Sequence, residues 1–568
     1  MTDTERHWGH RRIEGGWEIA TWAPTAERMT LEVDGTSRKM ETQDGWHIAR
    51  IEAVEGATYG FRRDGDTLLP DPASRAQSGG VHAPSKLIDI SAIPRTEWSG
   101  RPWEETSILE LHVGTFTEEG TLAAAARKLP DLASLGFTCV ELMPLAQFDG
   151  DRGWGYDGVL PFAVHPAYGT PRDMVAFVSA AHEAGLMVLV DAVYNHFGPE
   201  GAVLSQLCPT FFDEQRHTPW GAAIDFDKPQ VRSFFLQNAE MWLRDYGVDG
   251  LRLDAVHQIG REGDTDFLTE LSERVIALDL DRPLHLVTED ERNLVSYVGR
   301  DALQAQWNDD YHHAVHCLLT GESQSYYAPF SDDPFGDMVT ALRDGQVDQG
   351  QPRPNTEDRR GEPSSELPPI CFVNANQTHD QIGNRAFGDR LIALAGPERM
   401  EVMHAMLCLA PFVPMLFMGE EIGSRAPFQF FTDFHGDLAD AVRKGRRSEF
   451  PEFADAQDEI PDPNAPETFA RSRPYADLPE DADDWRALTR ACLALRKSHV
   501  VPLLKSGWRE TRVERTGPGT LLATWVFEQG RLDLTFSTEG PAPAIPTTEL
   551  FSHERPGAAM RMGIGGAE

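Results

Sequence analysis

The first stretch of the chain alternates apolar and polar residues. Met29, Leu31 and Val33 each have polar neighbours on both sides, and pairs of Asp followed by Gly separate such runs. Alternation with a period of two is typical of strands that bury one face only. Several short strands of this kind between turns predict a β-sandwich over residues 1–97.

A different pattern begins near residue 107, where short apolar runs alternate with amphipathic stretches. The runs cover residues 108–112, 139–143, 187–190, 251–253, 285–287, 369–373 and 414–417. Most are apolar throughout, as strands buried on both faces must be. Between two of them, helical spacing places Met174, Phe177 and Val178 on one face, and Gly185 can end that helix. Repeated β-α units predict an α/β fold, a (β/α)₈ TIM barrel over residues 98–497, with a doubly wound open sheet as the alternative.

Alternation returns near the C-terminus and predicts a small β domain. Residues 520–525 and 531–536 carry the pattern, within a predicted domain of residues 498–568. Two loops of the barrel region look inserted. They cover residues 198–218 and residues 350–367, and the Pro and Ser content of the second predicts a flexible segment.

Composition narrows the possible partners and the compartment. The 568 residues carry a net charge of −38, which argues against nucleic acid and anionic membranes because a phosphate-binding surface must be basic. No stretch approaches the roughly 20 consecutive apolar residues that a membrane span needs. The first residues lack the apolar core of a secretory signal. The six cysteines form no CxxC pair, which favours buried free thiols, and we therefore expect a cytoplasmic protein.

Carboxylates stand at the ends of three predicted strands. Asp254, Glu289 and Asp380 follow what we interpret as the fourth, fifth and seventh strands, where a parallel barrel places its functional residues. Retaining glycoside hydrolysis needs two carboxylates about 5–5.5 Å apart, and neighbouring strands lie about 4.8 Å apart. The third carboxylate can stabilise a positively charged transition state. A single Asp after a strand is more often a helix cap, so the residues alone leave a structural role open.

At these residues the sequence resembles the α-amylase superfamily of glycoside hydrolases. The resemblance is carried by Asp191-Ala-Val-Tyr-Asn-His196, by Gly250-Leu-Arg-Leu-Asp-Ala-Val-His257, by Glu289 and by His379-Asp380. It implies that Asp254 is the nucleophile, Glu289 the general acid/base, and Asp380 the residue that distorts the sugar in subsite −1. It also implies orienting or sugar-binding roles for Arg252, His257, His196, Tyr156 and His379.

Within the superfamily, the sequence most resembles the maltooligosyltrehalose trehalohydrolase family. The matching stretches are residues 70–75, 80–82, 110–117, 289–293, 307–313, 379–385, 417–421 and 426–429. The resemblance implies a hydrolase that cleaves the α-1,4 bond next to the terminal trehalose of maltooligosyl trehalose and releases trehalose. It places five further residues in the substrate groove: Asp309, Asp310, His313, Gln381 and Asn384. Thr378 departs from the Asn that is usual in the family, which puts any role of that side chain in doubt.

Two other functions stay open at this point. A branching or debranching enzyme would share the three carboxylates on the same scaffold, whereas a non-catalytic glucan-binding protein would lack one of them. The resemblance implies no metal and no cofactor, although Asn195 aligns with a calcium ligand of many amylases. The expected partners are an α-1,4-glucan substrate and a functional pairing with a maltooligosyl trehalose synthase, with no nucleic acid and no membrane.

Overall fold

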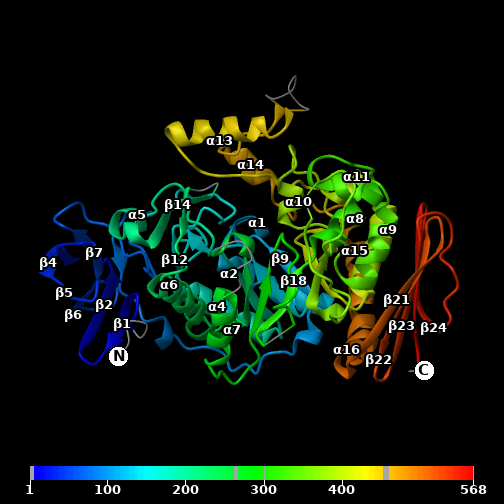
Figure 1. Cartoon of the computed structure of the whole chain (residues 1–568), viewed down its shortest axis with the longest axis horizontal. Coiled ribbons are helices and arrows are strands. Elements are labelled where there is room, and N and C mark those ends of the chain that lie inside the picture. The colour runs from blue at the N-terminus through cyan, green and yellow to red at the C-terminus, as the bar shows by residue number, and fades with distance from the viewer. Residues whose placement is uncertain are drawn as a thin grey trace.

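A computed structural model describes residues 6–218, 221–260, 266–299, 301–357, 359–451 and 459–566. Figure 1 shows the N-terminal strands in blue at one end of the molecule, helices and strands of the barrel in the middle, and the C-terminal sheet in red at the other end.

The N-terminal part is a β-sandwich of two antiparallel four-stranded sheets. The first contains β1 (Gly9–Ile13), β2 (Gly16–Trp22), β6 (Trp46–Ile51) and β5 (Glu41–Gln43), and the second contains β4 (Thr36–Lys39), β3 (Met29–Val33), β7 (Thr58–Arg63) and β8 (Ser85–Lys86). Trp17 and Ile19 of the first sheet share a hydrophobic core with Leu31 and Phe61 of the second. The predicted sandwich is confirmed, because alternate residues of both sheets fill the space between them.

Eight parallel strands close into a barrel and follow one another in chain order. They are β9 (Ile108–Leu111), β10 (Cys139–Leu142), β13 (Met187–Ala192), β16 (Gly250–Leu253), β17 (His285–Thr288), β18 (Leu303–Trp307), β19 (Phe372–Ala375) and β20 (Val413–Phe417). Closure of β20 onto β9 confirms the barrel and excludes the open sheet. The apolar pattern missed β18, and it started the seventh strand too early, since Pro369–Cys371 form a 3₁₀ turn.

The α-helices lie in the segments that connect the barrel strands and in the segments that follow the last strand. They are α1 (Val113–Phe116), α2 (Leu122–Ala126), α3 (Leu129–Leu135), α4 (Pro171–Glu183), α5 (Leu204–Leu207), α6 (Pro229–Glu240), α7 (Asp266–Ile276), α8 (Asp309–Thr320), α9 (Pro334–Asp344), α10 (His379–Gly383), α11 (Leu391–Ala395), α12 (Pro397–Leu409), α13 (Gly436–Ser448), α14 (Pro466–Arg471), α15 (Ala482–Leu495) and α16 (Val501–Ser506). The expected helix is α4, and Gly185 follows it with a φ of 80°. The predicted inserted loop 198–218 holds α5 and β14 (Phe212–Thr218), which pairs with β15 (Gly221–Ile224).

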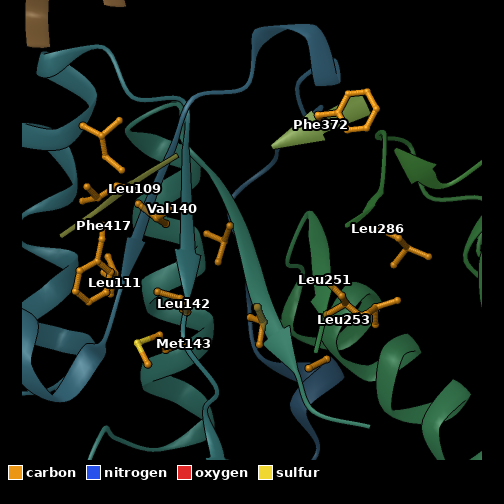
Figure 2. Packing of buried hydrophobic residues seen from close by; sticks show 14 of the residues in the cluster. Leu109, Leu111, Val140, Leu142, Met143, Leu251, Leu253, Leu286, Phe372 and Phe417 are labelled. Atoms are coloured by element: carbon orange, nitrogen blue, oxygen red, sulfur yellow. The ribbon is translucent and has the colours of Figure 1, made fainter. Parts of the chain in front are cut away.

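Side chains alternate between the outside and the inside of the barrel. Leu109, Leu111, Val140 and Leu142 belong to the main core that includes the surrounding helices (Figure 2). Residues that alternate with these along the strands face the interior. There Ile108, Cys139, Leu189, Val287, Val373 and Met415 form a separate apolar cluster. On four of these strands the position two residues further along is charged: Glu110, Glu141, Asp191 and Glu289. The interior is therefore apolar at one end and polar at the end that carries the candidate site.

The C-terminal part is a five-stranded antiparallel sheet in the order β21 (Trp508–Gly517), β22 (Thr520–Phe527), β23 (Gly530–Ser537), β25 (Ala558–Gly565) and β24 (Thr548–Arg555). This confirms the predicted C-terminal β structure. The predicted domain boundaries stay predictions; the one after residue 497 falls inside a continuous helical stretch, residues 482–506. Among the described residues, no helix is long and apolar enough to span a membrane.

Candidate active site

Arg252 lies at the centre of the charged end of the barrel. It projects inward from β16, and its side chain is completely buried. Nη1 donates hydrogen bonds to Asp191 (2.8 Å) and Asp254 (2.7 Å), and Nη2 donates to Glu289 (2.8 Å). The guanidinium also lies over the Trp307 ring, 4.1 Å from its centroid. One cation thus orients three carboxylates from three neighbouring strands.

Asp254 is held in its ionised form. Its Oδ1 accepts from Arg252, and its Oδ2 accepts from the Asn195 amide at 2.7 Å. Burial alone would raise the pKa of Asp254, but the neighbouring cation and the amide hydrogen bond outweigh burial, so the pKa lies below its ordinary value. Asn195, which sequence comparison aligned with a calcium ligand, uses its amide nitrogen on Asp254 and its oxygen on His196.

Glu289 has the opposite protonation preference. Its Oε2 accepts from Arg252 and from the backbone nitrogen of Ala255 (2.9 Å). Burial raises the pKa of Glu289 well above its ordinary value; Arg252 opposes the shift, and the charge of Asp254 adds to it. Two carboxylates bound to one guanidinium therefore have pKa values that are shifted in opposite directions. That difference is what an acid and a nucleophile acting together require.

Asp380 stands beside this pair on the short helix α10. Thr378 caps the helix: its hydroxyl accepts from the Asp380 nitrogen (3.3 Å) and donates to the Gln381 side chain (2.6 Å). His379 contacts Asp380 through Nε2 at 3.4 Å and Glu110 of β9 through Nδ1. Burial lowers the pKa of His379, but Asp380 and Glu110 raise it to about 9, so the ring carries a positive charge. Thr378 thus has a structural task that its short side chain can perform.

Tyr156 and His196 line the opposite side of the same site. The Tyr156 hydroxyl donates to Asp191 at 2.6 Å, and its ring stacks on His379 with centroids 5.1 Å apart. His196 Nε2 contacts the Tyr156 carbonyl at 2.9 Å. The structure therefore brings together the predicted residues Arg252, Asp254, Glu289, Tyr156, His196, His379 and Asp380.

A cavity of about 560 Å³ opens next to Glu289 and Asp380. The predicted residues His257, Asp309, His313, Gln381 and Asn384 also line it. Burial raises the pKa of Asp309 to about 6, and the charge of Asp380 contributes. Tyr326, 43% exposed, forms part of the wall. Its neighbour Tyr327 is buried and packs in the core.

Asp310 does not line this cavity, unlike its neighbour Asp309. Its completely buried carboxylate accepts from the backbone nitrogens of Val347 (2.9 Å) and Asp348 (2.7 Å), and from Arg360 (2.7 Å). Asn293 donates to it as well, at 2.9 Å. We therefore assign Asp310 to loop anchoring rather than sugar contact.

The loop predicted to be flexible forms one wall of the cavity. Two arginines anchor it: Arg353 forms a paired contact with Asp337 (2.8 Å each), and Arg360 bonds Asp348 (2.7 Å) as well as Asp310. Paired arginine–carboxylate contacts of this kind fix geometry. Pro and Ser content therefore does not describe how firmly this part of the chain is held.

Sequence reasoning missed Glu110 and gave Asp191 and Asn195 no role in catalysis. Glu110 stands alone in the run Ile108-Leu-Glu-Leu111, and a single charge in an otherwise apolar strand was the available signal. Glu141 of β10 has the same signal and lies opposite Glu110 in register. No group of three or more potential metal-ligating side chains occurs in the part of the chain that the structure describes.

Similarity to known proteins extends over nearly the whole chain. The family model for the alpha amylase catalytic domain matches residues 94–215. The malto-oligosyltrehalose trehalohydrolase of Deinococcus radiodurans is 39% identical over 97% of this chain and 94% of its own length. The chain belongs to the malto-oligosyltrehalose trehalohydrolase family. The resemblance seen at residues 307–313 and 379–385 was therefore correct.

Structural similarity agrees with membership in the malto-oligosyltrehalose trehalohydrolase family. A crystal structure of a Salmonella typhimurium protein described as an alpha amylase has a TM-score of 0.93 and 44% identity, and the match covers 99% of this chain and 100% of that one. The 1,4-alpha-glucan branching enzyme GlgB of Bacillus caldolyticus is 30% identical over only 57% of this chain and 59% of its own length. The branching-enzyme alternative is therefore weaker and partial.

Proposed function

We propose that this protein hydrolyses the α-1,4 bond next to the terminal trehalose of malto-oligosyl trehalose and retains the anomeric configuration. Family membership supports the substrate. The observation that carries the mechanism is the contrast between Asp254, whose pKa is lowered, and Glu289, whose pKa is raised, on one guanidinium. A retaining hydrolase needs that division between an ionised nucleophile and a protonated acid.

The proposed reaction has two displacement steps. The Asp254 carboxylate attacks the anomeric carbon, the glycosidic bond breaks, and Glu289 donates its proton to the departing oxygen of trehalose. Glu289, now ionised, then removes a proton from water while the water oxygen attacks the same carbon and releases Asp254. Glu289 regains its proton, and two inversions give net retention.

The neighbouring groups support the charge that develops on the sugar ring. Arg252 keeps Asp254 ionised between turnovers and holds both carboxylates at a fixed orientation. We assign to Asp380 a contact with the sugar in subsite −1, where its carboxylate would stabilise the positive ring. Tyr156 offers a ring face beside that position, a surface on which a sugar can stack.

We assign the cavity beside Glu289 to sugar units close to the bond that is broken. Its size is within the usual range for small-ligand sites. The wall combines the exposed ring of Tyr326 with carboxylate, amide and imidazole side chains. Such a mixture suits a ligand with apolar faces and many hydroxyl groups.

Activity assays with two substrates test the proposal. We expect trehalose from maltotriosyl trehalose and no branch transfer or α-1,6 cleavage with amylopectin. The Asp254→Asn variant should lose activity by at least about a thousandfold, because the nucleophile is removed but the shape is kept. Product configuration, followed by NMR within the first turnovers, should match the substrate. Branch transfer, or inverted product, would overturn the proposal.

We infer a cytoplasmic location and a substrate supplied by a maltooligosyl trehalose synthase. Six buried cysteines without a disulfide among the described residues suit a reducing compartment. A glucan with a terminal trehalose requires an enzyme that rearranges the reducing end of a maltooligosaccharide. Cell fractionation, together with coupled assays that start from maltopentaose, tests both points.

A further inference from the structure

Helix α10 carries His379 and Asp380 but is only five residues long. A helix this short makes few internal hydrogen bonds, so its position depends on contacts at its ends. Thr378 and Gln381 satisfy its N-terminal groups through a capping box. At the other end, the carbonyl oxygen of Gly383, the last residue of α10, needs a donor from outside the helix, and Arg385 follows two residues later.

Arg446 supplies that donor from a distant part of the chain. Its Nη2 donates to the carbonyl oxygens of Gly383 and Arg385, both at 2.7 Å. Its Nη1 donates to Glu449 at 2.9 Å. The side chain is only 6% exposed. A buried guanidinium therefore spans the C-terminal end of α10.

Aromatic rings hold the guanidinium in place. It lies over Phe450 at 4.7 Å and over Phe430 at 5.5 Å from the ring centroids. Phe430 in turn contacts Trp154 edge-on, with centroids 5.3 Å apart. A cation between two ring faces gains electrostatic energy that partly offsets its burial.

Trp154 fixes the other side of α10. A Cβ atom added to Gly383 would lie 2.1 Å from the Trp154 ring, so the helix backbone rests directly on the indole. Trp154 also meets His379 edge-on, at 5.5 Å between centroids. Helix α10 is thus confined between Trp154 on one side and Arg446 at its end.

Helix α13, which carries Arg446, has little other reason to bury a cation. Figure 1 shows it standing out from the body of the molecule at the top of the view. Ala439 and Arg446 are the buried residues of this helix. Burying a guanidinium is unfavourable unless it is well paired, and the main-chain partners of this one are the last residue of α10 and a residue two positions beyond it.

We propose that Arg446 is a positioning residue for Asp380: it fixes the C-terminal end of α10 and thereby holds the carboxylate at the sugar ring. This inference rests on the proposed function, because it assumes that Asp380 acts on the substrate. Misplacing a catalytic group by about 1 Å can lower the rate by about 100-fold. Asn384, which lines the cavity, lies between the two residues whose carbonyl oxygens Arg446 holds, so its position depends on the same contact.

A double-mutant cycle with maltotriosyl trehalose tests the inference. Arg446→Met should lower kcat by about 100-fold, and the fall in kcat should exceed any rise in KM, because Asp380 acts in the transition state. Arg446→Lys keeps a cation near Phe450 and should recover part of the loss. Lys444→Met, on the exposed face of the same helix, is the matched control and should act like the wild type. Circular dichroism and thermal unfolding show whether each variant is folded.

The decisive comparison uses the Asp380→Asn background. If Arg446 acts through Asp380, then Arg446→Met should change kcat by less than about threefold in that background. An equal loss in both backgrounds would overturn the inference, as would full kcat in Arg446→Met. If the wild type releases no trehalose, or Asp380→Asn is fully active, the proposed function fails instead.

Discussion

Replacing Arg252 with Met should move the whole pH profile of the enzyme to higher pH. The substitution removes the cation and leaves a side chain of similar length. Three carboxylates then face one another without their shared donor: Asp191, Asp254 and Glu289. Arg252 lowers the pKa of both Asp254 and Glu289, so its loss raises both.

The size of the effect follows from the contacts. A hydrogen bond to a charged group contributes about 1.5–3 kcal/mol. If only the bond to Asp254 matters in the transition state, kcat/KM falls by roughly 10- to 150-fold at the wild-type optimum. Losing the other two bonds mainly destabilises the fold, because removing the cation of a buried ion pair costs about 3–5 kcal/mol, even though Asp191 keeps the Tyr156 hydroxyl and Glu289 keeps the Ala255 nitrogen.

The direction of the pH shift can be worked out for each limb. The acidic limb reports Asp254, which must be ionised, and a raised pKa moves that limb to higher pH. The alkaline limb reports Glu289, which must be protonated, and its raised pKa moves that limb in the same direction. The loss of activity should therefore be greatest at acidic pH and should shrink as the pH rises.

The assay is kcat/KM for maltotriosyl trehalose from about pH 4 to about pH 9. Arg425→Met is the matched control, because Arg425 is 39% exposed and pairs with Asp481 away from the site. Arg252→Lys covers the case in which the Met variant does not fold. A uniform loss of activity with both limbs unmoved would refute the reasoning, since it would mean that Arg252 acts by geometry alone.

Three further predictions use other parts of the molecule. Glu141 is fully buried without a hydrogen-bond partner, and burial raises its pKa well above the ordinary value. As the pH rises, the carboxyl group therefore loses its proton in the unfolded state before it does so in the folded state. The folded state loses stability over that range. Glu141→Gln should remove this loss of unfolding free energy, which is about 1.4 kcal/mol per pH unit. The variant should therefore become increasingly more stable than the wild type in urea unfolding above about pH 5. Gly383→Ala should displace α10 from Trp154, lower kcat and change tryptophan fluorescence, whereas Gly445→Ala, in open space on α13, should leave kcat unchanged. The acidic groups behind the net charge of −38 repel one another, and salt screens this repulsion. Tm should therefore rise when the KCl concentration increases from about 0.05 M to about 1 M, and an unchanged Tm would contradict this.

The barrel could be predicted because strands buried on both faces leave a plain mark in the sequence. Six of the eight barrel strands coincide with predicted apolar runs, and a seventh overlaps one at its end. The missed strand, β18, contains Gln304 and Gln306, which interrupt the run. Ala305 and Trp307 on either side of Gln306 face the interior, so Gln306 points outward, where it donates to the Asp290 carbonyl at 3.2 Å. A rule that expects apolar strands fails where an outward-facing side chain bonds the backbone of a neighbouring segment instead of packing against a helix.

The carboxylates of the candidate site were located by their position after strands, but their different charge was not visible in the sequence. Asp254 and Glu289 both follow short apolar strands, and nothing local separates a nucleophile from an acid. Both are buried, and the separation comes from Asn195, which donates to Asp254, and from the nearby carboxylates that raise the pKa of Glu289: Asp254, Asp380 and Asp309. Those contacts join residues that are distant in the chain, so only the fold reveals them.

Asp309 and Asp310 show how one motif can carry two tasks. Sequence comparison gave both the same role in the groove. They are consecutive residues at the start of α8, and consecutive positions on a helix point in different directions. Asp309 faces the cavity with a pKa near 6, whereas Asp310 holds Arg360 and the loop that forms the cavity wall. The shape of the cavity therefore depends on a residue that need not touch the substrate, and substitutions at Asp310 should alter substrate selection through the wall rather than through the chemistry.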